Sequence, residues 1–366
     1  MRIEKVRILD FRNIPFLELE LCDGPNVIYG ENGQGKTNFI EAIWLFTGAK
    51  SFRGARDAQM VRFDQPQAAL ELDFFAAERD QHALVTIDHK RMAVLNEIPL
   101  KSASELAGRF CAVVFSPAHL SLIKNGPAEK RRFVDISICQ LKPAYLKVLA
   151  QYHRTLEQRN RLLKDVQMES SLFDTLDAWD ARLCSLAAQV VQVRRSYLER
   201  LSPWAREIYQ GISGQREALE FQYRATLGGG EGPPDQERML QALRAARGED
   251  LRARATTLGP HRDDVEILLD GHSARVYGSQ GQQRSCVLAL KLAECQLMRQ
   301  VLGEYPVVLL DDVMSELDLS RRDYLLNSLR DRQLVFTCCD AGDFRTIGRG
   351  RGIRIENGRA VEITQF

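Results

Sequence analysis

The sequence predicts an α/β fold in which both ends of the chain build one domain and a mostly helical segment interrupts it. Three observations lead to this prediction. Strand-like alternation fills residues 1–115, amphipathic helical periodicity replaces it from about residue 118, and strand character returns near residue 265. We therefore expect one domain from residues 1–118 together with 256–366, and a helical arm domain from residues 119–255.

The first part of the chain predicts short strands and one strong helix. Period-2 alternation indicates strands at residues 6–8, 17–21 and 70–74. The apolar run at residues 26–29 is typical of a buried strand, and it leads into a glycine-rich loop and an apolar helix near Lys36.

Helical periodicity predicts two long helices in the arm, over residues 128–168 and 172–212. Glycine and proline indicate a loop at residues 228–234, and a further helix is expected over residues 235–246. Strands then follow at residues 265–269, closed by an Asp270-Gly271 turn, and at 307–310.

Composition describes an ordinary globular chain. Apolar residues make up 45% and charged residues 27% of the sequence, which excludes a disordered or fibrous protein. Fifty Lys and Arg against 49 Asp and Glu give a net charge of +1, so any nucleic-acid site must be a local patch.

The sequence also bounds the location of the protein. None of the eight cysteines is spaced as a C-x-x-C pair, and most lie in apolar surroundings, so we expect reduced core thiols. The first residues alternate like a strand, and no apolar run is long enough for a signal peptide or a membrane span. A cytoplasmic protein without a membrane segment is expected.

A phosphate-binding loop is predicted by the pattern G-x-x-x-x-G-K-[ST]. Its residues are Gly30, Glu31, Asn32, Gly33, Gln34, Gly35, Lys36 and Thr37. The glycines let successive N–H groups point at phosphate oxygens, and the positive end of the following helix adds to the attraction. Lys36 is expected to reach the β and γ phosphates of a nucleotide, and the Thr37 hydroxyl to ligate Mg²⁺.

A second motif places two acids at the end of an apolar strand. Residues 307–310 are Val-Val-Leu-Leu, and Asp311 and Asp312 follow. In nucleotide hydrolases of this kind the first acid, Asp311, holds Mg²⁺, and the second, Asp312, can orient the attacking water. A strand that ends in a helix-capping Asp would look the same, so this motif gains its weight from the phosphate loop.

A third motif begins the long helix before those acids. The run Ser279-Gln280-Gly281-Gln282 resembles the S-x-G-Q signature of the ABC ATPases, in which the turn binds the γ-phosphate of the nucleotide on the opposite protomer. The resemblance therefore implies nucleotide contacts for Ser279, Gly281 and Gln282. An ordinary helix cap by Ser279 remains an alternative.

The motifs also depart from the ABC pattern. Residues 315–318 look like the D-loop that crosses the same dimer interface, but no histidine follows the strand at residues 334–337, where a switch histidine is usual. The usual catalytic Glu is replaced by Asp312. Both departures predict slow hydrolysis. Arg53 could reach a phosphate, and a structural role in a turn is favoured for His261.

Together these residues resemble the RecF family, SMC-like members of the ABC ATPases, over nearly the whole chain. Specific matches include residues 29–38, the Gly-Pro-His-Arg-Asp-Asp run at 259–264, residues 279–284 and residues 309–318. The resemblance implies an ATP-dependent homodimer that binds double-stranded DNA, a weak DNA-stimulated ATPase activity that needs Mg²⁺, and work with RecO and RecR. Such proteins help to load RecA at single-strand gaps and support the SOS response.

The arm offers one check that is independent of the resemblance. Residues 121–260 carry 22 Lys and Arg against 17 Asp and Glu. Such an excess could line a clamp around DNA phosphates, or it could be a set of solvated, paired helix faces. The candidate lining residues are Lys130, Arg131, Arg132, Arg159, Arg161, Lys164, Arg194 and Arg195.

Four other functions compete. A transporter ATPase subunit usually has fewer residues between loop and signature than the 243 positions from Lys36 to Ser279. A small-molecule kinase has no use for the signature, and an SMC protein needs far longer arms. A scaffold that binds ATP without hydrolysing it stays open, since Asp312 and the missing histidine both weaken catalysis.

Overall fold

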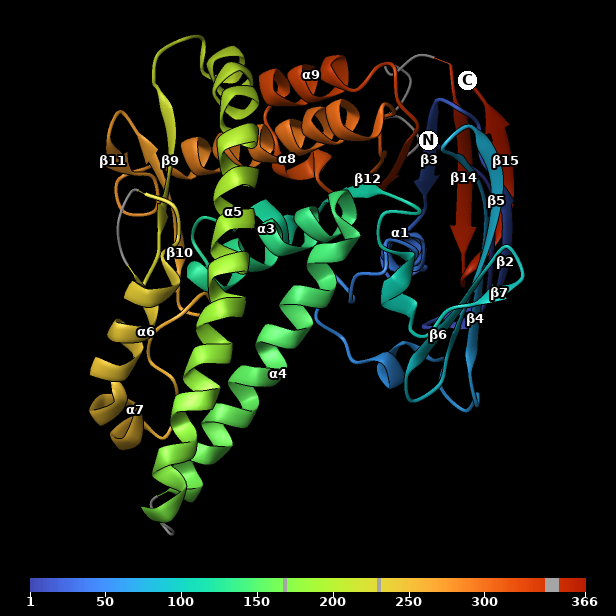
Figure 1. Ribbon diagram of the computed structural model, residues 1–366. Helices are drawn as coiled ribbons and strands as arrows, with labels where there is room; N and C mark the ends of the chain where they lie inside the picture. Colours follow the sequence, from blue (N-terminus) through green and yellow to red (C-terminus); the bar gives the residue numbers. More distant parts are fainter. Residues whose placement is uncertain (121, 167–169, 229–231, 340–348) are drawn as a thin grey trace. The chain divides into compact units, whose positions relative to one another are not determined.

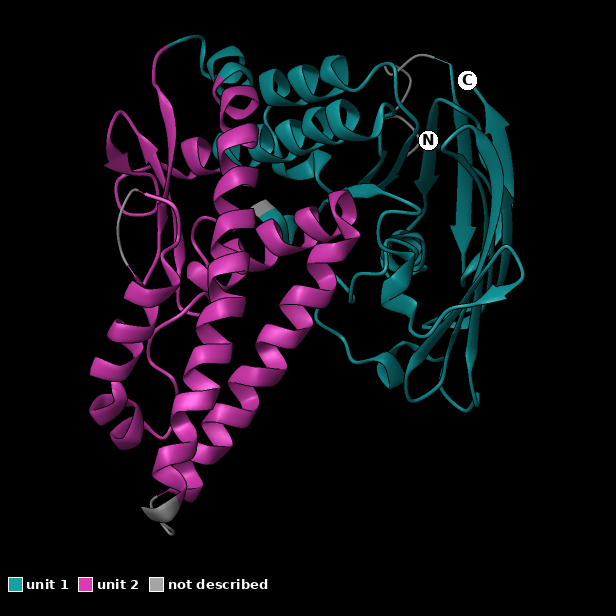
Figure 2. Cartoon of the chain, in the orientation of Figure 1, with its two compact units in different colours: residues 1–121, 207–215, 284–366 teal, residues 122–206, 216–283 magenta. Residues whose placement is uncertain are grey.

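The computed structural model describes residues 1–366 except 121, 167–169, 229–231 and 340–348 (Figure 1). The chain forms two compact units (Figure 2). Unit 1 comprises residues 1–121, 207–215 and 284–366, and unit 2 comprises residues 122–206 and 216–283. Both ends of the chain therefore belong to unit 1, as expected from the return of strand character.

Unit 1 contains a six-stranded sheet in the order β15-β14-β3-β13-β12-β8. All neighbours in it are parallel except the edge pair of β14 and β15. Nearly every residue of β3, β8, β12 and β13 is buried, as parallel strands covered on both faces require. The strands are β3 (Pro25–Tyr29), β8 (Ala112–Phe115), β12 (Val307–Asp311), β13 (Leu334–Cys338), β14 (Arg351–Glu356) and β15 (Arg359–Gln365).

A second sheet of unit 1 is antiparallel, in the order β2-β1-β4-β5-β6-β7. Its strand β4 is buried at every second residue, so one face lies on the core and the other toward solvent. Of its strands, β5 to β7 were not anticipated from the sequence. The strands are β1 (Arg2–Phe11), β2 (Ile14–Glu20), β4 (Ala68–Ala76), β5 (Arg79–Ile87), β6 (Arg91–Leu95) and β7 (Ile98–Pro99).

Helix α1 of unit 1 follows the glycine-rich loop and is buried along most of its length, between the strands of the two sheets that it contacts. The helix α8 begins with the predicted signature, and the division between the units falls between Gln283 and Arg284 inside it. The helices are α1 (Lys36–Leu45), α2 (Pro117–Leu120), α8 (Gln280–Leu302) and α9 (Leu319–Ser328).

Unit 2 combines helices with a three-stranded sheet in the order β11-β10-β9. Residues 228–234, expected to be a loop, lie partly outside the described residues. The elements are α3 (Pro127–Leu141), α4 (Pro143–Asp165), α5 (Leu176–Ser213), which continues into unit 1, α6 (Gln236–Ala245), α7 (Arg247–Ala253), β9 (Leu219–Arg224), β10 (Asp264–Leu269) and β11 (His272–Ser273).

The prediction of a single helix over residues 128–168 is wrong. The chain forms α3 and α4 instead, because Pro143 lacks an N–H and disfavours a helical residue before it. Lys142 accordingly leaves the helical region, with φ −138° and ψ 81°. Residues 167 and 168, the expected end of that helix, lie outside the described residues.

The domain boundaries differ from expectation in the arm. The first division falls at residue 121 against the expected 118, residues 207–215 belong to unit 1 although they were expected in the arm, and the final return to unit 1 comes at residue 284, not at 256. The reason is strand pairing, since β10 pairs along its length with β9 of the arm and is closed by a turn at Asp270 and Gly271. Both turn residues have positive φ, 47° and 77°, as a tight hairpin needs.

Candidate nucleotide site

The phosphate loop joins β3 to α1 and depends on its glycines. Gly30, Gly33 and Gly35 all have positive φ, at 146°, 82° and 111°. A Cβ atom on Gly30 would lie 2.4 Å from the carbonyl oxygen of Ile355, and one on Gly35 would lie 2.9 Å from Oδ1 of Asn13. Larger residues are therefore excluded by strain at all three positions and by contact at two of them.

Lys36 starts helix α1 and turns back across the loop. Its Nζ donates to the carbonyl oxygens of Gly30 and Glu31, at 2.6 and 2.8 Å, and the side chain is largely buried. The ammonium group thus lies over the same peptide groups that would surround a phosphate, at the positive end of a helix. A polar cleft of about 430 Å³ borders this loop and is lined in part by Gly30, Glu31, Gln34 and Arg354.

The loop and the predicted acidic strand meet at Thr37. The Thr37 hydroxyl donates to Oδ1 of Asp311 at 2.8 Å, and the hydroxyl of Thr337 approaches the same oxygen at 3.2 Å. Asp311 is 5% exposed. Burial raises the pKa of Asp311 above its ordinary value, and the hydrogen bonds from Thr37 and Thr337 lower it in part.

These oxygens fit Mg²⁺. Mg²⁺ is usually bound by one or two protein oxygens while phosphates and waters complete its octahedron, and Thr37 and Asp311 offer one hydroxyl and one carboxylate. A dedicated protein cage is absent from the described residues, which contain no group of three or more His, Cys, Asp or Glu able to hold a metal ion.

Asp312 differs from Asp311 in burial and in backbone conformation. It is exposed, and its φ of 50° lies in the left-handed region that non-glycine residues avoid. Its N–H donates to Oγ1 of Thr337 at 2.9 Å, and its carboxylate has a long contact of 3.4 Å with the Ser315 hydroxyl. The strained backbone therefore turns this carboxylate away from the strand while Asp311 stays inside it.

Several residues that hold the loop were not anticipated. Nδ2 of Asn13 donates to the carbonyl of Gly33 at 2.7 Å, and Asn38 donates to Oδ1 of Asn13. Arg53, expected only as a possible phosphate contact, donates to Oδ1 of Asn38 at 2.8 Å and lies 3.6 Å from Glu41. The sequence carries no periodic signal for these contacts, because they join separate loops.

Ser279 and Gln282 form a reciprocal cap at the start of α8. The N–H of Gln282 donates to Oγ of Ser279 at 3.2 Å, and the N–H of Ser279 donates to Oε1 of Gln282 at 2.6 Å. The side-chain nitrogen of Gln282, Nε2, donates to Oε1 of Glu217 at 2.5 Å. Ser279 thus caps the helix, which is the alternative to a nucleotide contact. A nucleotide contact by Ser279, Gly281 or Gln282 stays a prediction.

Residues 315–318, which resemble a D-loop, are hydrogen-bonded to the same helix, α8. Arg284 donates to the carbonyl and the carboxylate of Glu316, each at 2.6 Å. Arg321 donates to Oγ of Ser285 at 2.8 Å and pairs with Asp318, which caps α9. Residues 315–318 are therefore bonded, directly and through Arg321, to the second turn of α8.

His261 has the structural role that was favoured for it. Its Nδ1 lies 2.6 Å from the hydroxyl of Tyr152 and its Nε2 lies 3.0 Å from the carbonyl of Thr256. The neighbouring Asp263 is buried and accepts from Tyr223 and from the N–H and hydroxyl of Thr226. The Gly-Pro-His-Arg-Asp-Asp run thus fixes the interior of unit 2.

Three of the expected DNA-lining residues are buried and cannot line a channel. Lys130, Arg159 and Arg194 are 5%, 0% and 2% exposed. Lys130 pairs with Asp264 at 2.6 Å, and Arg194 pairs with Asp135 at 2.8 Å. The sequence could not reveal this, because a long run of helix with alternating charge has the same pattern whether its basic residues face solvent or carboxylates of other segments.

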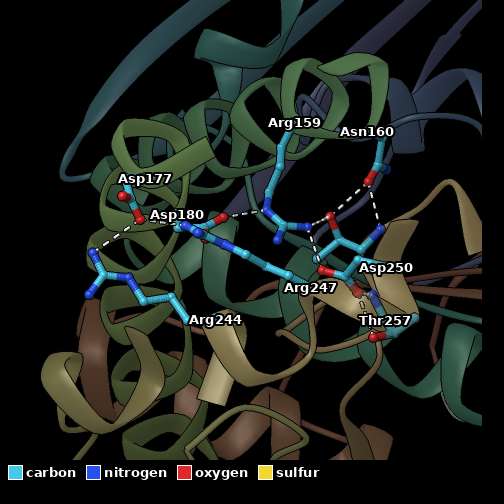
Figure 3. Close-up of polar contacts among 9 residues, drawn as sticks. Arg159, Asn160, Asp177, Asp180, Arg244, Arg247, Asp250 and Thr257 are labelled. Atoms are coloured by element: carbon cyan, nitrogen blue, oxygen red, sulfur yellow. Dashed lines mark hydrogen bonds and ion pairs between the residues drawn. The ribbon is translucent and has the colours of Figure 1, made fainter. Parts of the chain in front are cut away.

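Arg159 is the centre of a larger network within unit 2 (Figure 3). Its guanidinium contacts the buried carboxylates of Asp180 at 2.6 Å and Asp250 at 2.7 Å. Arg247 pairs with Asp180 and Asp177, so the network joins α4, α5 and α7. By contrast, Arg161 is 63% exposed and, among the described residues, forms its one ion pair with Glu157 of its own helix, as the solvated-face alternative expects.

Two further expectations concern the cysteines and the helices. All eight cysteines lie among the described residues and are free, as expected. Burial raises the pKa of the Cys111 and Cys295 thiols to about 12, so both are inert at neutral pH. In the part of the chain that the structure describes, no helix has the length and apolar character needed to span a bilayer.

The chain is similar to known proteins over nearly its full length. The family model described as the RecF/RecN/SMC N terminal domain matches residues 2–359. The DNA replication and repair protein RecF of Agathobacter rectalis is 41% identical over 348 residues, 94% of each chain. The protein of that name in Acetivibrio thermocellus is 39% identical and covers 98% of this chain and 99% of the relative.

Solved structures agree with these relatives. A structure of the recombination mediator protein RecF-ATP in the RecFOR pathway matches with a TM-score of 0.91 and 34% identity, covering 100% of this chain and 97% of the other. An Smc head domain bound to the C-terminal domain of ScpA, from Pyrococcus furiosus, shares the fold, with a TM-score of 0.55, 16% identity and coverage of 100% and 96%. The chain therefore belongs to the RecF family of ABC-type ATPases.

Proposed function

We propose that this protein is an ATP-gated dimeric clamp on double-stranded DNA that acts in cytoplasmic recombinational repair and replication-fork maintenance with RecO and RecR. The observation that carries the proposal is the contact of Thr37 with buried Asp311, which joins the phosphate loop to the acidic strand at a Mg²⁺-compatible site. The relatives named DNA replication and repair protein RecF and the RecF-ATP structure support the biological assignment.

Nucleotide binding follows from the loop. The N–H groups of residues 30–35 and the start of α1 offer donors and a positive dipole end to the phosphates, and Lys36 supplies a full charge. Mg²⁺ bound by Thr37 and Asp311 would neutralise the developing phosphate charge. Because Lys36 donates to Gly30 and Glu31, its ammonium group exchanges these carbonyls for phosphate oxygens on binding.

Hydrolysis is assigned to Asp312. Its exposed carboxylate is held beyond the end of β12 by the strained backbone, where it can orient a water molecule toward the γ-phosphate. A shorter acid than the usual Glu, and the lack of a histidine in residues 334–348, both favour slow turnover. These departures also support the second candidate function, a scaffold in which ATP only holds the dimer together.

Dimerisation is assigned to the signature. The exposed Ser279 hydroxyl and the N–H groups at the start of α8 would bind the γ-phosphate of the nucleotide held by a second chain. Only a nucleotide with a γ-phosphate could bridge the two protomers, so ATP, and not ADP, would close the clamp. The arm units would then enclose duplex DNA, and hydrolysis would release it.

The solution mass tests this proposal. We expect a monomer with ADP, a dimer with ATP and Mg²⁺, and retention of that dimer on duplex DNA. Lys36→Met should stay monomeric, because it loses the charge that holds the phosphates. A monomer under every condition would refute the clamp and return weight to a small-molecule kinase.

Asp312→Asn separates the clamp from the scaffold. The amide cannot act as a base but leaves the phosphate contacts intact, so this variant should bind ATP and accumulate dimer while turnover falls. Unchanged turnover would remove Asp312 from catalysis. If the unmodified protein dimerises with ATP but never hydrolyses it, the scaffold function is correct.

A further inference from the structure

The start of α8 is held in unit 2 by two glutamine side chains. The side-chain oxygen of Gln282 accepts from the Ser279 N–H and completes the cap, and its side-chain nitrogen donates to the carboxylate of Glu217. Nε2 of Gln283 lies 3.0 to 3.3 Å from the carbonyl oxygens of Ala274, Arg275 and Gly278. The first turn of α8 is therefore positioned by side-chain contacts that lie outside the helix.

The backbone beside Glu217 is anchored by hydrogen bonds. It lies just before β9, and the next residue, Ala218, exchanges two hydrogen bonds with Asp270 at the β10–β11 turn, at 2.8 and 3.0 Å. The backbone next to Glu217 is thus anchored at the edge of the small sheet, and from there its carboxylate accepts from Gln282. Because Gln282 must turn its oxygen to the Ser279 N–H and its nitrogen to Glu217, the two contacts select one orientation of its amide.

We propose that Glu217 is a positioning residue for the trans-acting signature: by holding the Gln282 amide, it sets the cap that places the Ser279 hydroxyl for the nucleotide of a second chain. This inference rests on the proposed composite ATP site. It adds a residue that none of the sequence motifs contains, 62 positions before Ser279, on a different segment of unit 2.

The inference predicts a defect in turnover, not in nucleotide affinity. Glu217→Ala should lower ATP turnover at saturating ATP about tenfold, because a hydrogen bond to a charged acceptor is lost. Binding of ATP to the single chain should not change, since the phosphate loop is intact. Glu217→Gln should retain most activity, because its amide oxygen still accepts from Gln282. Glu220→Ala, on the same sheet, is the matched control and should behave as the unmodified protein.

Mixing experiments place the defect in trans. In a mixed dimer of Ser279→Arg and Lys36→Met, one site combines the intact loop of the first chain with the intact signature of the second. Turnover by this mixture, where each variant alone is inactive, would establish the composite site itself. Glu217→Ala mixed with Lys36→Met should recover in the same way, whereas Glu217→Ala mixed with Ser279→Arg should not. No recovery in the first mixture would refute the proposed function, and recovery there without recovery in the second would refute only the role of Glu217.

A charge swap tests the contact without truncating a side chain. Gln282→Glu keeps the cap, since Glu is a standard partner at this position, but sets two carboxylates against each other and should lower turnover. Adding Glu217→Gln restores an amide facing a carboxylate and should recover it. Failure of the double variant to recover, reduced ATP affinity, or a loss of turnover that only follows the melting temperature would each overturn the proposal.

Discussion

Asp311 and Asp312 are adjacent in the sequence but lie in opposite environments. Asp311 is buried at the end of β12 beside two hydroxyls, whereas Asp312 is exposed and has a left-handed backbone. A buried carboxylate with fixed neighbours suits a metal ligand, and an exposed one suits a group that exchanges protons with water. A single change of backbone direction thus separates the two roles assigned to this pair.

His261 gives unit 2 a dependence on pH. Burial lowers the pKa of His261 below its ordinary value of 6.5, and the neutral ring bonds to Tyr152 and Thr256. Because the folded state disfavours the charged ring, its contribution to stability is present above pH 6.5 and is lost as the pH falls below that value. Denaturant midpoints measured between pH 8 and pH 5.5 should fall for the unmodified protein and fall less for His261→Gln.

The exposed His89 provides the control for that experiment. His89→Gln should leave the pH dependence of the midpoint as it is in the unmodified protein. An equal pH dependence in His261→Gln and the unmodified protein would show that other groups cause the loss of stability.

At the level of elements, buried ion pairs of the arm connect helices that are distant in the sequence. Removing the guanidinium with Arg159→Ala would leave Asp180 and Asp250 buried without their partner. We expect a loss of about 3–5 kcal/mol in the free energy of unfolding of unit 2, measured by chemical denaturation.

Arg161→Ala is the matched control on the same helix. It removes an exposed i,i+4 pair with Glu157, which is worth only about 0.3–0.5 kcal/mol. If both substitutions cost the same, the network around Arg159 does not hold the segments together.

Contiguous motifs made part of this site predictable. The phosphate loop and the acidic strand each carry their chemistry within a few residues, so the sequence indicated both, and the parallel sheet brings their ends to one edge. Thr337, Asn13 and Glu217 were missed because each contributes one side chain from a distant segment. Pro143 was present in the sequence as a helix breaker, but the strong amphipathic period on both sides of it masked that signal.

At the scale of the molecule, exposure limits which basic residues of the arm could contact DNA phosphates. Lys147, Arg154 and Arg161 are exposed on α4 at intervals of seven residues, so they share one face and span about 21 Å. If this face contacts phosphates, Gln substitutions at all three positions should weaken duplex binding and reduce the slope of log affinity against log salt by up to about 2.7.

A second triple variant removes the same charge elsewhere in unit 2. Arg238, Arg252 and Arg254 are exposed in α6 and at the end of α7. Their Gln substitutions should leave the salt slope unchanged. Equal slopes in both triple variants would show that α4 does not contact the DNA backbone.

The position of β3 in its sheet has a consequence for how the protein is made. Its two neighbours, β13 and β14, lie about 300 residues later in the chain. At synthesis rates of roughly 5–20 residues per second, β3 leaves the ribosome roughly 15–60 s before it can pair with either neighbour. The segments of unit 2 are complete earlier, at residue 283. Nucleotide binding is therefore among the last properties that a nascent chain acquires. Until then the apolar strand β3 has neither of its two neighbours in the sheet.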